Sequence, residues 1–191
     1  MSKQKQIAEI LKKLKNKRLV VVLGIVALFF LISLVFWLSK PNEKIVMAHQ
    51  QVSDLATNIR RFYQAKPDAW GLNTSTAIKN GLPTPQMING RQLQNALGKE
   101  VLLGADILGN TVMPGSRNAV IVYKNLNKEE CEVMATMSFD EKMQLSLNTI
   151  SIVNEKEYKF TWGGENSLPV SEAKADEICL DANDILWDIY L

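Results

Sequence analysis

The longest hydrophobic stretch of the chain is Leu19–Leu38, in which twenty consecutive positions carry no charge. An α-helix rises about 1.5 Å per residue, so a helix of this length spans about 30 Å, the thickness of the hydrocarbon core of a bilayer. The pattern therefore predicts a transmembrane helix over residues 19–38. This helix would separate a short segment, residues 1–18, from a larger soluble domain, residues 39–191.

A second hydrophobic pattern follows Pro41. Apolar side chains recur every three or four residues, which places them on one face of a helix that we expect from about Asn42 to Gln64. This seam is short for a coiled coil, so the favoured interpretation is packing on the chain's own domain. The seam consists of Ala48 and of five residues that we predict to dock the helix on a sheet: Ile45, Val52, Leu55, Ile59 and Phe62.

The rest of the chain alternates short apolar runs with turn residues. Strands are expected at residues 100–104, 118–123, 150–153, 158–162 and 184–191, and short helices at 75–79, 91–97, 128–137 and 171–178. Asn127 is the expected N-cap of the third of these helices. Strands joined by turns with few long crossovers favour an antiparallel sheet. The predicted fold class is therefore α+β, with one long N-terminal helix packed on an antiparallel β-sheet.

Charge is distributed very unevenly along the chain. Residues 1–18 hold seven Lys and Arg and one Glu, a net charge of +6, whereas the remainder carries −4. Positively charged flanks stay in the cytoplasm, so we expect the N-terminus inside and the C-terminal domain in the periplasm of a bacterial host. Within residues 1–18 the apolar positions also repeat at helical spacing, which predicts a basic amphipathic helix that contacts anionic membrane lipid.

A cleaved signal peptide is the alternative interpretation of the apolar run. Its apolar core would be about 7–15 residues long and would end in small residues. Here the run is longer and ends in Phe36, Trp37 and Leu38. These features favour a single-pass anchor in the inner membrane.

Candidate chemistry is sparse. Cys131 and Cys179 are the two cysteines, which allow one intrachain disulfide or, alternatively, two unpaired buried thiols. His49, the single histidine, is expected at the surface and is far from the cysteines in sequence, so no metal site is predicted. The acids at 129, 130 and 132 are interpreted as a solvated helix face rather than as a metal or acid–base cluster.

No catalytic or cofactor-binding motif is found, and the net acidic domain argues against nucleic-acid binding. We therefore predict a protein that is not an enzyme.

Several segments, taken in order, resemble the type IVb pilins. They are Leu55–Arg60 with Phe62 and Tyr63, then Gly81–Gly90, Asn118–Cys131, and Cys179 followed by Asn183–Tyr190. The resemblance covers roughly residues 45–191. It implies a pilin fold, a Cys131–Cys179 disulfide that bounds a C-terminal region, and partners that are other pilin-like or pilus and secretion proteins. In such a protein we expect this disulfide to clamp the sheet edge to the final strand.

The N-terminal region departs from the pilin pattern. A prepilin has a glycine at the cytoplasmic edge of its apolar segment and a glutamate at the fifth position after it. Here Gly24 lies inside the apolar run, and the fifth residue after it is Phe29. Moving each retained charge through hydrocarbon costs at least ~2.5–3.5 kcal/mol, so the basic segment would hold the chain in the membrane.

Three functional hypotheses follow. The favoured one is a non-enzymatic, membrane-anchored pilin-like component of a type IV pilus, a conjugative pilus or a related secretion machine. The second is a processed pilin subunit of a fibre. The third is a periplasmic binding or sensor module on a pilin-like fold, with contact surfaces at Asp181–Asp188 or Asp106–Ser116.

Overall fold

The structure is a computed structural model and describes residues 25, 29–30, 42–139 and 146–191. The chain divides into two units, Met1–Pro41 and Asn42–Leu191, and the second unit, called the body below, is described by itself. Most of the expected membrane segment, residues 19–38, lies outside the described residues. Among those that are described, no helix combines the length and the apolar character needed to cross a bilayer.

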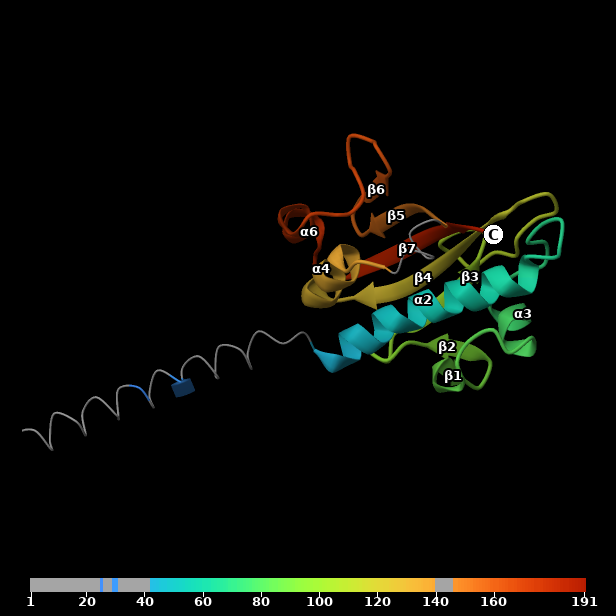
Figure 1. The fold of residues 1–191 in the computed structure, drawn as a ribbon, viewed down its shortest axis with the longest axis horizontal. Coiled ribbons are helices and arrows are strands. Elements are labelled where there is room, and N and C mark those ends of the chain that lie inside the picture. The colour runs from blue at the N-terminus through green and yellow to red at the C-terminus, as the bar shows by residue number, and fades with distance from the viewer. Residues whose placement is uncertain (1–24, 26–28, 31–41, 140–145) are drawn as a thin grey trace, which may run out of the picture. The chain divides into compact units, whose positions relative to one another are not determined.

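The body begins with the helix α2, Glu43–Tyr63, within one residue of the expected bounds at each end. The side chain of Asn42 caps it by accepting a hydrogen bond from the backbone N–H of Lys44 at 3.0 Å. One face of α2 is buried against the sheet, along which the helix runs in Figure 1. Tyr123 on the sheet fastens the two layers, because its hydroxyl donates to the Ala48 carbonyl at 2.9 Å.

The strands of the described residues form a seven-stranded sheet in which all strand pairs are antiparallel, in the spatial order β1-β2-β3-β4-β7-β5-β6. The strands are β1 (Ile88–Asn89), β2 (Gln92–Gln94), β3 (Glu100–Gly104), β4 (Asn118–Leu126), β5 (Leu147–Val153), β6 (Glu157–Thr161) and β7 (Asn183–Tyr190). The predicted α+β class is thus confirmed. The last strand in sequence, β7, lies in the middle of the sheet, between β4 and β5.

The core lies between α2 and one face of this sheet. Along β7 the side chains alternate, with Ile185, Trp187 and Ile189 fully buried and the intervening positions partly exposed. Trp187 pairs across the sheet with Ile121 of β4 and Ile150 of β5, which are also buried. The inward-facing apolar side chains of the strands and the apolar seam of α2 therefore form one hydrophobic core.

The described part of the body also contains four short helices: α3 (Thr74–Lys79), the 3₁₀ helix η1 (Pro85–Met87), α4 (Lys128–Thr136) and α6 (Glu172–Ile178). The expected cap of α4 is confirmed as a reciprocal capping box, in which the Asn127 side chain accepts from the Glu130 N–H and the Glu130 carboxylate accepts from the Asn127 N–H. In Figure 1, α4 and α6 lie together at one end of the body, and the C-terminus lies at the other.

The prediction of a helix at residues 91–97 was wrong. Ile88–Asn89 and Gln92–Gln94 instead form a hairpin, joined by a two-residue turn that begins at Gly90. Gly90 has φ +63°, a conformation that glycine adopts without steric cost and that suits a tight hairpin turn. The pairing of β2 with β3 outweighs the weak local preference of this segment for a helix.

Candidate interaction site at the disulfide

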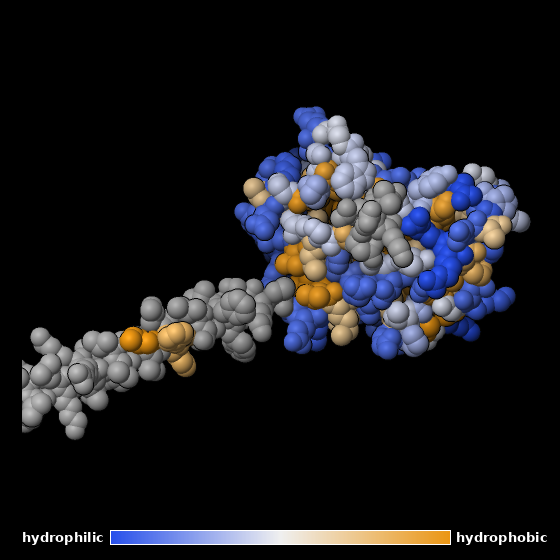
Figure 2. All heavy atoms as spheres, in the orientation of Figure 1, coloured by the Kyte–Doolittle hydropathy of each residue, from blue (hydrophilic) through white to orange (hydrophobic). Residues whose placement is uncertain are grey.

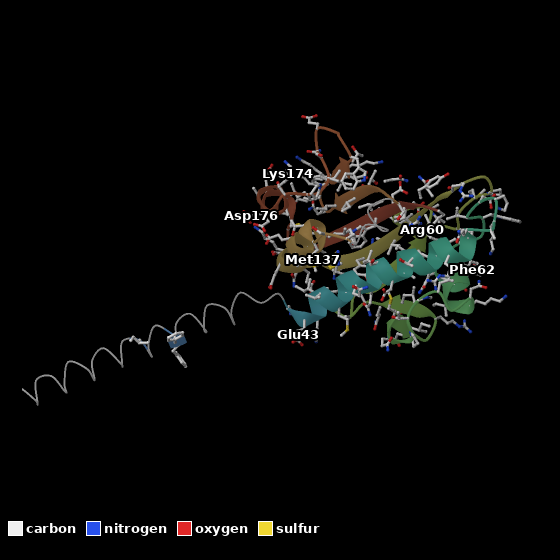
Figure 3. The ribbon with its side chains drawn as sticks, in the orientation of Figure 1. Glu43, Arg60, Phe62, Met137, Lys174 and Asp176 are labelled. Carbon is white, nitrogen blue, oxygen red and sulfur yellow. A yellow bond between two sulfur atoms is a disulfide. The ribbon has the colours of Figure 1, made fainter. Side chains whose placement is uncertain are left out.

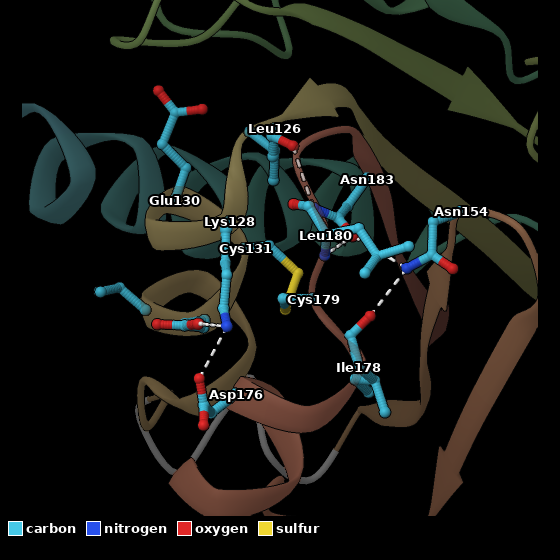
Figure 4. Close-up of a disulfide and its surroundings, with 12 residues drawn as sticks. Leu126, Lys128, Glu130, Cys131, Asn154, Asp176, Ile178, Cys179, Leu180 and Asn183 are labelled. Carbon is cyan, nitrogen blue, oxygen red and sulfur yellow. Dashed lines mark hydrogen bonds and ion pairs between the residues drawn. A yellow bond between two sulfur atoms is a disulfide. The ribbon is translucent and has the colours of Figure 1, made fainter.

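Cys131 and Cys179 form the disulfide that the pilin resemblance implied, with both sulfur-bearing residues buried and their Cα atoms 5.9 Å apart. Cys131 belongs to α4, and Cys179 caps the C-terminal end of α6 (Figure 4). The sequence interpretation placed this bond between a sheet edge and the final strand. The structure corrects that expectation, because the bond joins two helices and the final strand β7 is central.

A buried amide network holds the segment that follows the disulfide. The side-chain oxygen of Asn183 accepts from the Leu180 N–H at 2.9 Å and from the Asn154 side-chain amide at 3.0 Å. Its amide group donates to the carbonyls of Leu126 and Leu180. Asn154 also donates to the Ile178 carbonyl at 2.9 Å. The turn between α6 and β7 is therefore tied to the end of β4 and to the β5–β6 turn.

Sequence reasoning did not single out Asn154 or Asn183 as organisers of this region. Asparagine in a turn is common, and nothing in its spacing indicates a buried role. The signal would have been a polar residue at the beginning of an otherwise apolar strand, where burial requires hydrogen-bond partners.

Next to the disulfide the surface forms an open groove of about 790 Å³. Its apolar lining comes from Val153, Cys179, Leu180 and Ala182. Its charged lining consists of one lysine, Lys128, and five carboxylates: Glu155, Asp176, Glu177, Asp181 and Asp184. The net charge of this lining is −4, so the groove is suited to a partner surface that combines cationic and apolar groups.

Ion pairs offset part of this negative charge. Lys128 lies 2.8 Å from the Asp176 carboxylate and 3.5 Å from that of Glu132. The hydrogen bond from Lys128 lowers the pKa of Asp176, and the same bond raises the pKa of Lys128. Asp184 pairs with Lys124. In the described part of the chain, Glu155 and Asp181 have no ion-pair partner within 4.0 Å. They are the carboxylates of the groove most available to a partner.

The three acids near Cys131 have different surroundings. Glu129 is exposed, as the solvated-face interpretation expected. Glu130 belongs to the capping box of α4 and lies 3.7 Å from the Lys99 ammonium, and Glu132 is partly buried and lies 3.5 Å from the Lys128 ammonium. Within the described ranges, no group of three His, Cys, Asp or Glu side chains is arranged to hold a metal ion.

The five predicted docking residues occupy the following places. Ile45, Val52, Leu55 and Ile59 are buried in the core, with exposures of 1% or less. Phe62 is only partly buried, and its ring lies edge-on to that of Tyr63 at 5.1 Å and beneath the Lys66 ammonium at 3.5 Å. Tyr63 is the fully buried aromatic residue at this end of the helix.

His49 does not lie at the surface, contrary to the expectation from its position beside the seam. Its ring stacks on Phe139 at 4.3 Å, because the segment that follows α4 covers this part of α2. Burial lowers the pKa of His49, and a hydrogen bond with the backbone of Met137 opposes that shift. The buried face of α2 is thus wider than its seam of apolar positions.

These features define a pilin-like protein: a long N-terminal helix on an antiparallel sheet, closed by a disulfide near its C-terminal end. The model of the Bundlin family matches residues 39–183, three quarters of the chain. The chain therefore belongs to the Bundlin family, and it is a type IVb pilin-like protein.

Two solved structures are similar to the chain. The crystal structure of a type IV b pilin from Salmonella typhi has 16% sequence identity and a TM-score of 0.49, over 76% of this chain and 96% of that one. The structure of TcpA, a type IV pilin from Vibrio cholerae El Tor biotype, has 10% identity and a TM-score of 0.49, over 77% of this chain and 99% of that one. No curated protein matches the chain.

Proposed function

We propose that this protein is a non-enzymatic pilin-like component of a type IV pilus, a conjugative pilus or a related secretion machine. It acts from the inner membrane, where residues 19–38 form a single-pass anchor, residues 1–18 lie in the cytoplasm on anionic lipid, and residues 39–191 lie in the periplasm. Its partners are other pilin-like or machine proteins.

The match to the Bundlin family over residues 39–183 carries this proposal. The disulfide supports an oxidising compartment for the body, since such bonds persist there. The uncharged run and the +6 segment before it support the anchor and its orientation. The Gly24 and Phe29 positions, which do not fit the prepilin pattern, support retention of the basic segment.

The N-terminus of the membrane-bound protein tests the anchor directly. Intact mass and N-terminal sequencing of chain extracted from membranes should show residues 1–18 still attached. The control is a double variant, Arg18→Gly with Leu23→Glu, which places a glycine at the edge of the run and a glutamate five positions later. In a host with a prepilin peptidase this variant should lose the basic segment. Loss of that segment from the natural chain would instead favour a processed fibre subunit.

Orientation and partners require separate measurements. Protease added to spheroplasts should degrade the body and spare residues 1–18, and protection of the body would contradict the periplasmic location. Purification in mild detergent after cross-linking should recover pilin-like or machine proteins. Recovery of the chain without any such protein would favour the binding-module hypothesis, for which the groove is the available site.

A further inference from the structure

The body carries a second distinct surface at the C-terminal end of α2, where two loops lie side by side (Figure 1). The loops are residues 64–72 and 111–117, and together we call them the tip. The Ala69 N–H donates to the Ser116 carbonyl at 2.7 Å, and two further backbone hydrogen bonds join positions 71 and 72 to Val112. The tip is therefore one structural unit, although its two segments are far apart in the sequence.

Asp68 holds both loops in place. One of its carboxylate oxygens accepts from the Trp70 N–H at 3.1 Å, within the first loop, and the other accepts from the Gly115 N–H at 2.7 Å, in the second. The bond from Gly115, followed by the one from Trp70, lowers the pKa of Asp68, so the carboxylate stays ionised. Gly115 follows Pro114 and has φ +84°, as the third position of a tight turn that begins at Met113 requires. The backbone of the tip is thus fixed at Trp70 and at Met113.

The tip exposes large apolar side chains. Trp70 is 65% exposed and Met113 is 69% exposed. Each is next in sequence to a member of the hydrogen-bonded pair at positions 71 and 112, so the two side chains start from neighbouring backbone. The face of the body seen in Figure 2 is largely hydrophilic, with hydrophobic residues in small areas. Tryptophan concentrates where a protein meets the polar surface of a bilayer, because its ring is apolar and its N–H is polar.

Positive charge surrounds these apolar groups, although the chain after residue 18 is net acidic. Residues 60–72 and 111–118 contain four Lys and Arg and one Asp. Arg61 and Lys66 are exposed, and among the described residues neither has an ion-pair partner within 4.0 Å. The Lys66 ammonium lies over the ring of Phe62, at 3.5 Å from its centre, at the end of α2 opposite to Glu43 in Figure 3. Two cations of the tip are therefore available to an anionic partner.

The arginines of this region share a pocket of about 270 Å³, lined by Thr57, Arg60, Arg61, Gln64, Arg117 and Leu191. Within the described part of the chain, its lining has no Asp or Glu side chain. The Arg117 guanidinium donates to the main-chain oxygen of Leu191 at 2.8 Å and to two carbonyls of the first loop, each at 3.2 Å. Its hydrogen bonds thus fix the pocket wall, so Arg61 is the arginine that we expect to contact a ligand.

We infer that the tip binds the surface of a bilayer that contains anionic phospholipid. Trp70 and Met113 enter the interfacial layer, and Arg61 and Lys66 contact the phosphate groups of the lipids. Arginine suits this role because its planar fork donates to phosphate oxygens. Apolar side chains flanked by unpaired cations, on an exposed surface rather than in a closed cavity, are typical of segments that lie on membranes. The inference goes beyond the proposed function, because the partner is lipid and the surface is separate from the acidic groove.

The full chain, held in nanodiscs of phosphatidylcholine, tests binding of the tip to added vesicles. Met113→Cys carries an environment-sensitive fluorophore, and the native cysteines do not compete because they are disulfide-bonded. Vesicles rich in phosphatidylglycerol should shift the emission to shorter wavelength, whereas vesicles of phosphatidylcholine alone should not. Glu165→Cys, labelled in the same way at another exposed position, is the control and should show no shift. Residues 1–18 can also bring vesicles to the nanodisc, but only insertion of the tip changes the surroundings of the first label.

Lipid titrations with the same label on the tip separate the contributions of charge and of apolar insertion. Arg61→Gln and Lys66→Gln should each raise the lipid concentration at half of the shift about fivefold, because each removes one cation from the anionic surface. Trp70→Ala should raise it at least about tenfold, because less apolar area leaves water. Arg91→Gln and Lys156→Gln remove exposed cations elsewhere on the body and should change it by less than about twofold.

Several results would overturn the inference. They are the absence of a shift with anionic vesicles, an equal shift with neutral vesicles or at the Glu165→Cys label, and titrations that Arg61→Gln and Trp70→Ala leave unchanged. Thermal unfolding of each variant should match that of the natural chain, because the replaced side chains are exposed. None of these results bears on the N-terminal sequence or on the recovery of protein partners, so a failure here is distinguishable from a failure of the proposed function.

Discussion

The amide of Asn183 provides the sharpest stability prediction. Its side chain is 1% exposed and takes part in four hydrogen bonds, to the Leu126 and Leu180 carbonyls and from the Leu180 N–H and the Asn154 amide. A buried hydrogen bond contributes about 1 kcal/mol net. Asn183→Ala should therefore reduce the free energy of unfolding by about 3–4 kcal/mol, a large share of the ~5–15 kcal/mol that a domain has.

Urea and thermal unfolding of the oxidised body, residues 42–191, measure this loss. At roughly 3 °C per kcal/mol, the midpoint of thermal unfolding should fall by about 10 °C. Asn166→Ala is the control, because Asn166 is exposed and should change stability by less than ~0.5 kcal/mol. Asn183→Asp keeps the two acceptor contacts but removes both donors, and it should also be destabilising. A loss of unfolding free energy below ~1 kcal/mol for Asn183→Ala would refute the view that this network stabilises the turn between α6 and β7 beside the groove.

Three further predictions concern the core and the disulfide. Cys179→Ser should lower the free energy of unfolding by about 4 kcal/mol, because the disulfide closes a long loop between positions 48 apart. Thiol mapping that finds both sulfurs free in the oxidised protein would contradict the disulfide. Leu55→Ala should cost ~2–5 kcal/mol in urea unfolding, whereas Phe62→Ala should cost less because Phe62 is only partly buried; equal losses would argue against our account of the helix face. Burial lowers the pKa of His49 in the folded chain. As the pH falls, the unfolded chain therefore binds a proton at this residue at a higher pH than the folded chain does. The contribution of neutral His49 to the free energy of unfolding is thus full above pH 6.5 and is lost as the pH falls from 6.5 to the lower pKa of the folded chain. In urea unfolding at a series of pH values, His49→Leu should remove this part of the pH dependence.

Local patterns were sufficient to predict much of the fold. The seam from Ile45 to Ile59 predicted α2, the β-branched run at 118–123 predicted the first two thirds of β4, and Asn127 predicted the start of α4. In each case the residue pattern that indicates the element is local, and tertiary packing or strand pairing stabilises the element. The pilin resemblance supplied the disulfide pairing, which residue spacing alone left open.

The features that sequence reasoning missed depend on contacts between distant segments. Asn183 is important because Leu126 and Asn154 meet it in space, 57 and 29 residues away in the chain. His49 is buried because the segment ending at Phe139 covers it. The acidic groove gathers side chains from the ends of several elements, and no linear pattern indicates that they are neighbours.

The central position of β7 has a consequence for biosynthesis. Without it, β1–β4 and β5–β6 are two partial sheets with open edges, because β7 is the strand that pairs with both β4 and β5. The open edge of β4 is a ready template for wrong pairing until residues 183–190 have been synthesised and have paired with it. Completion of the sheet therefore has to wait until nearly the whole chain has been synthesised. Chains that lack β7 would expose both edges to proteases and chaperones, which provides a checkpoint for completeness.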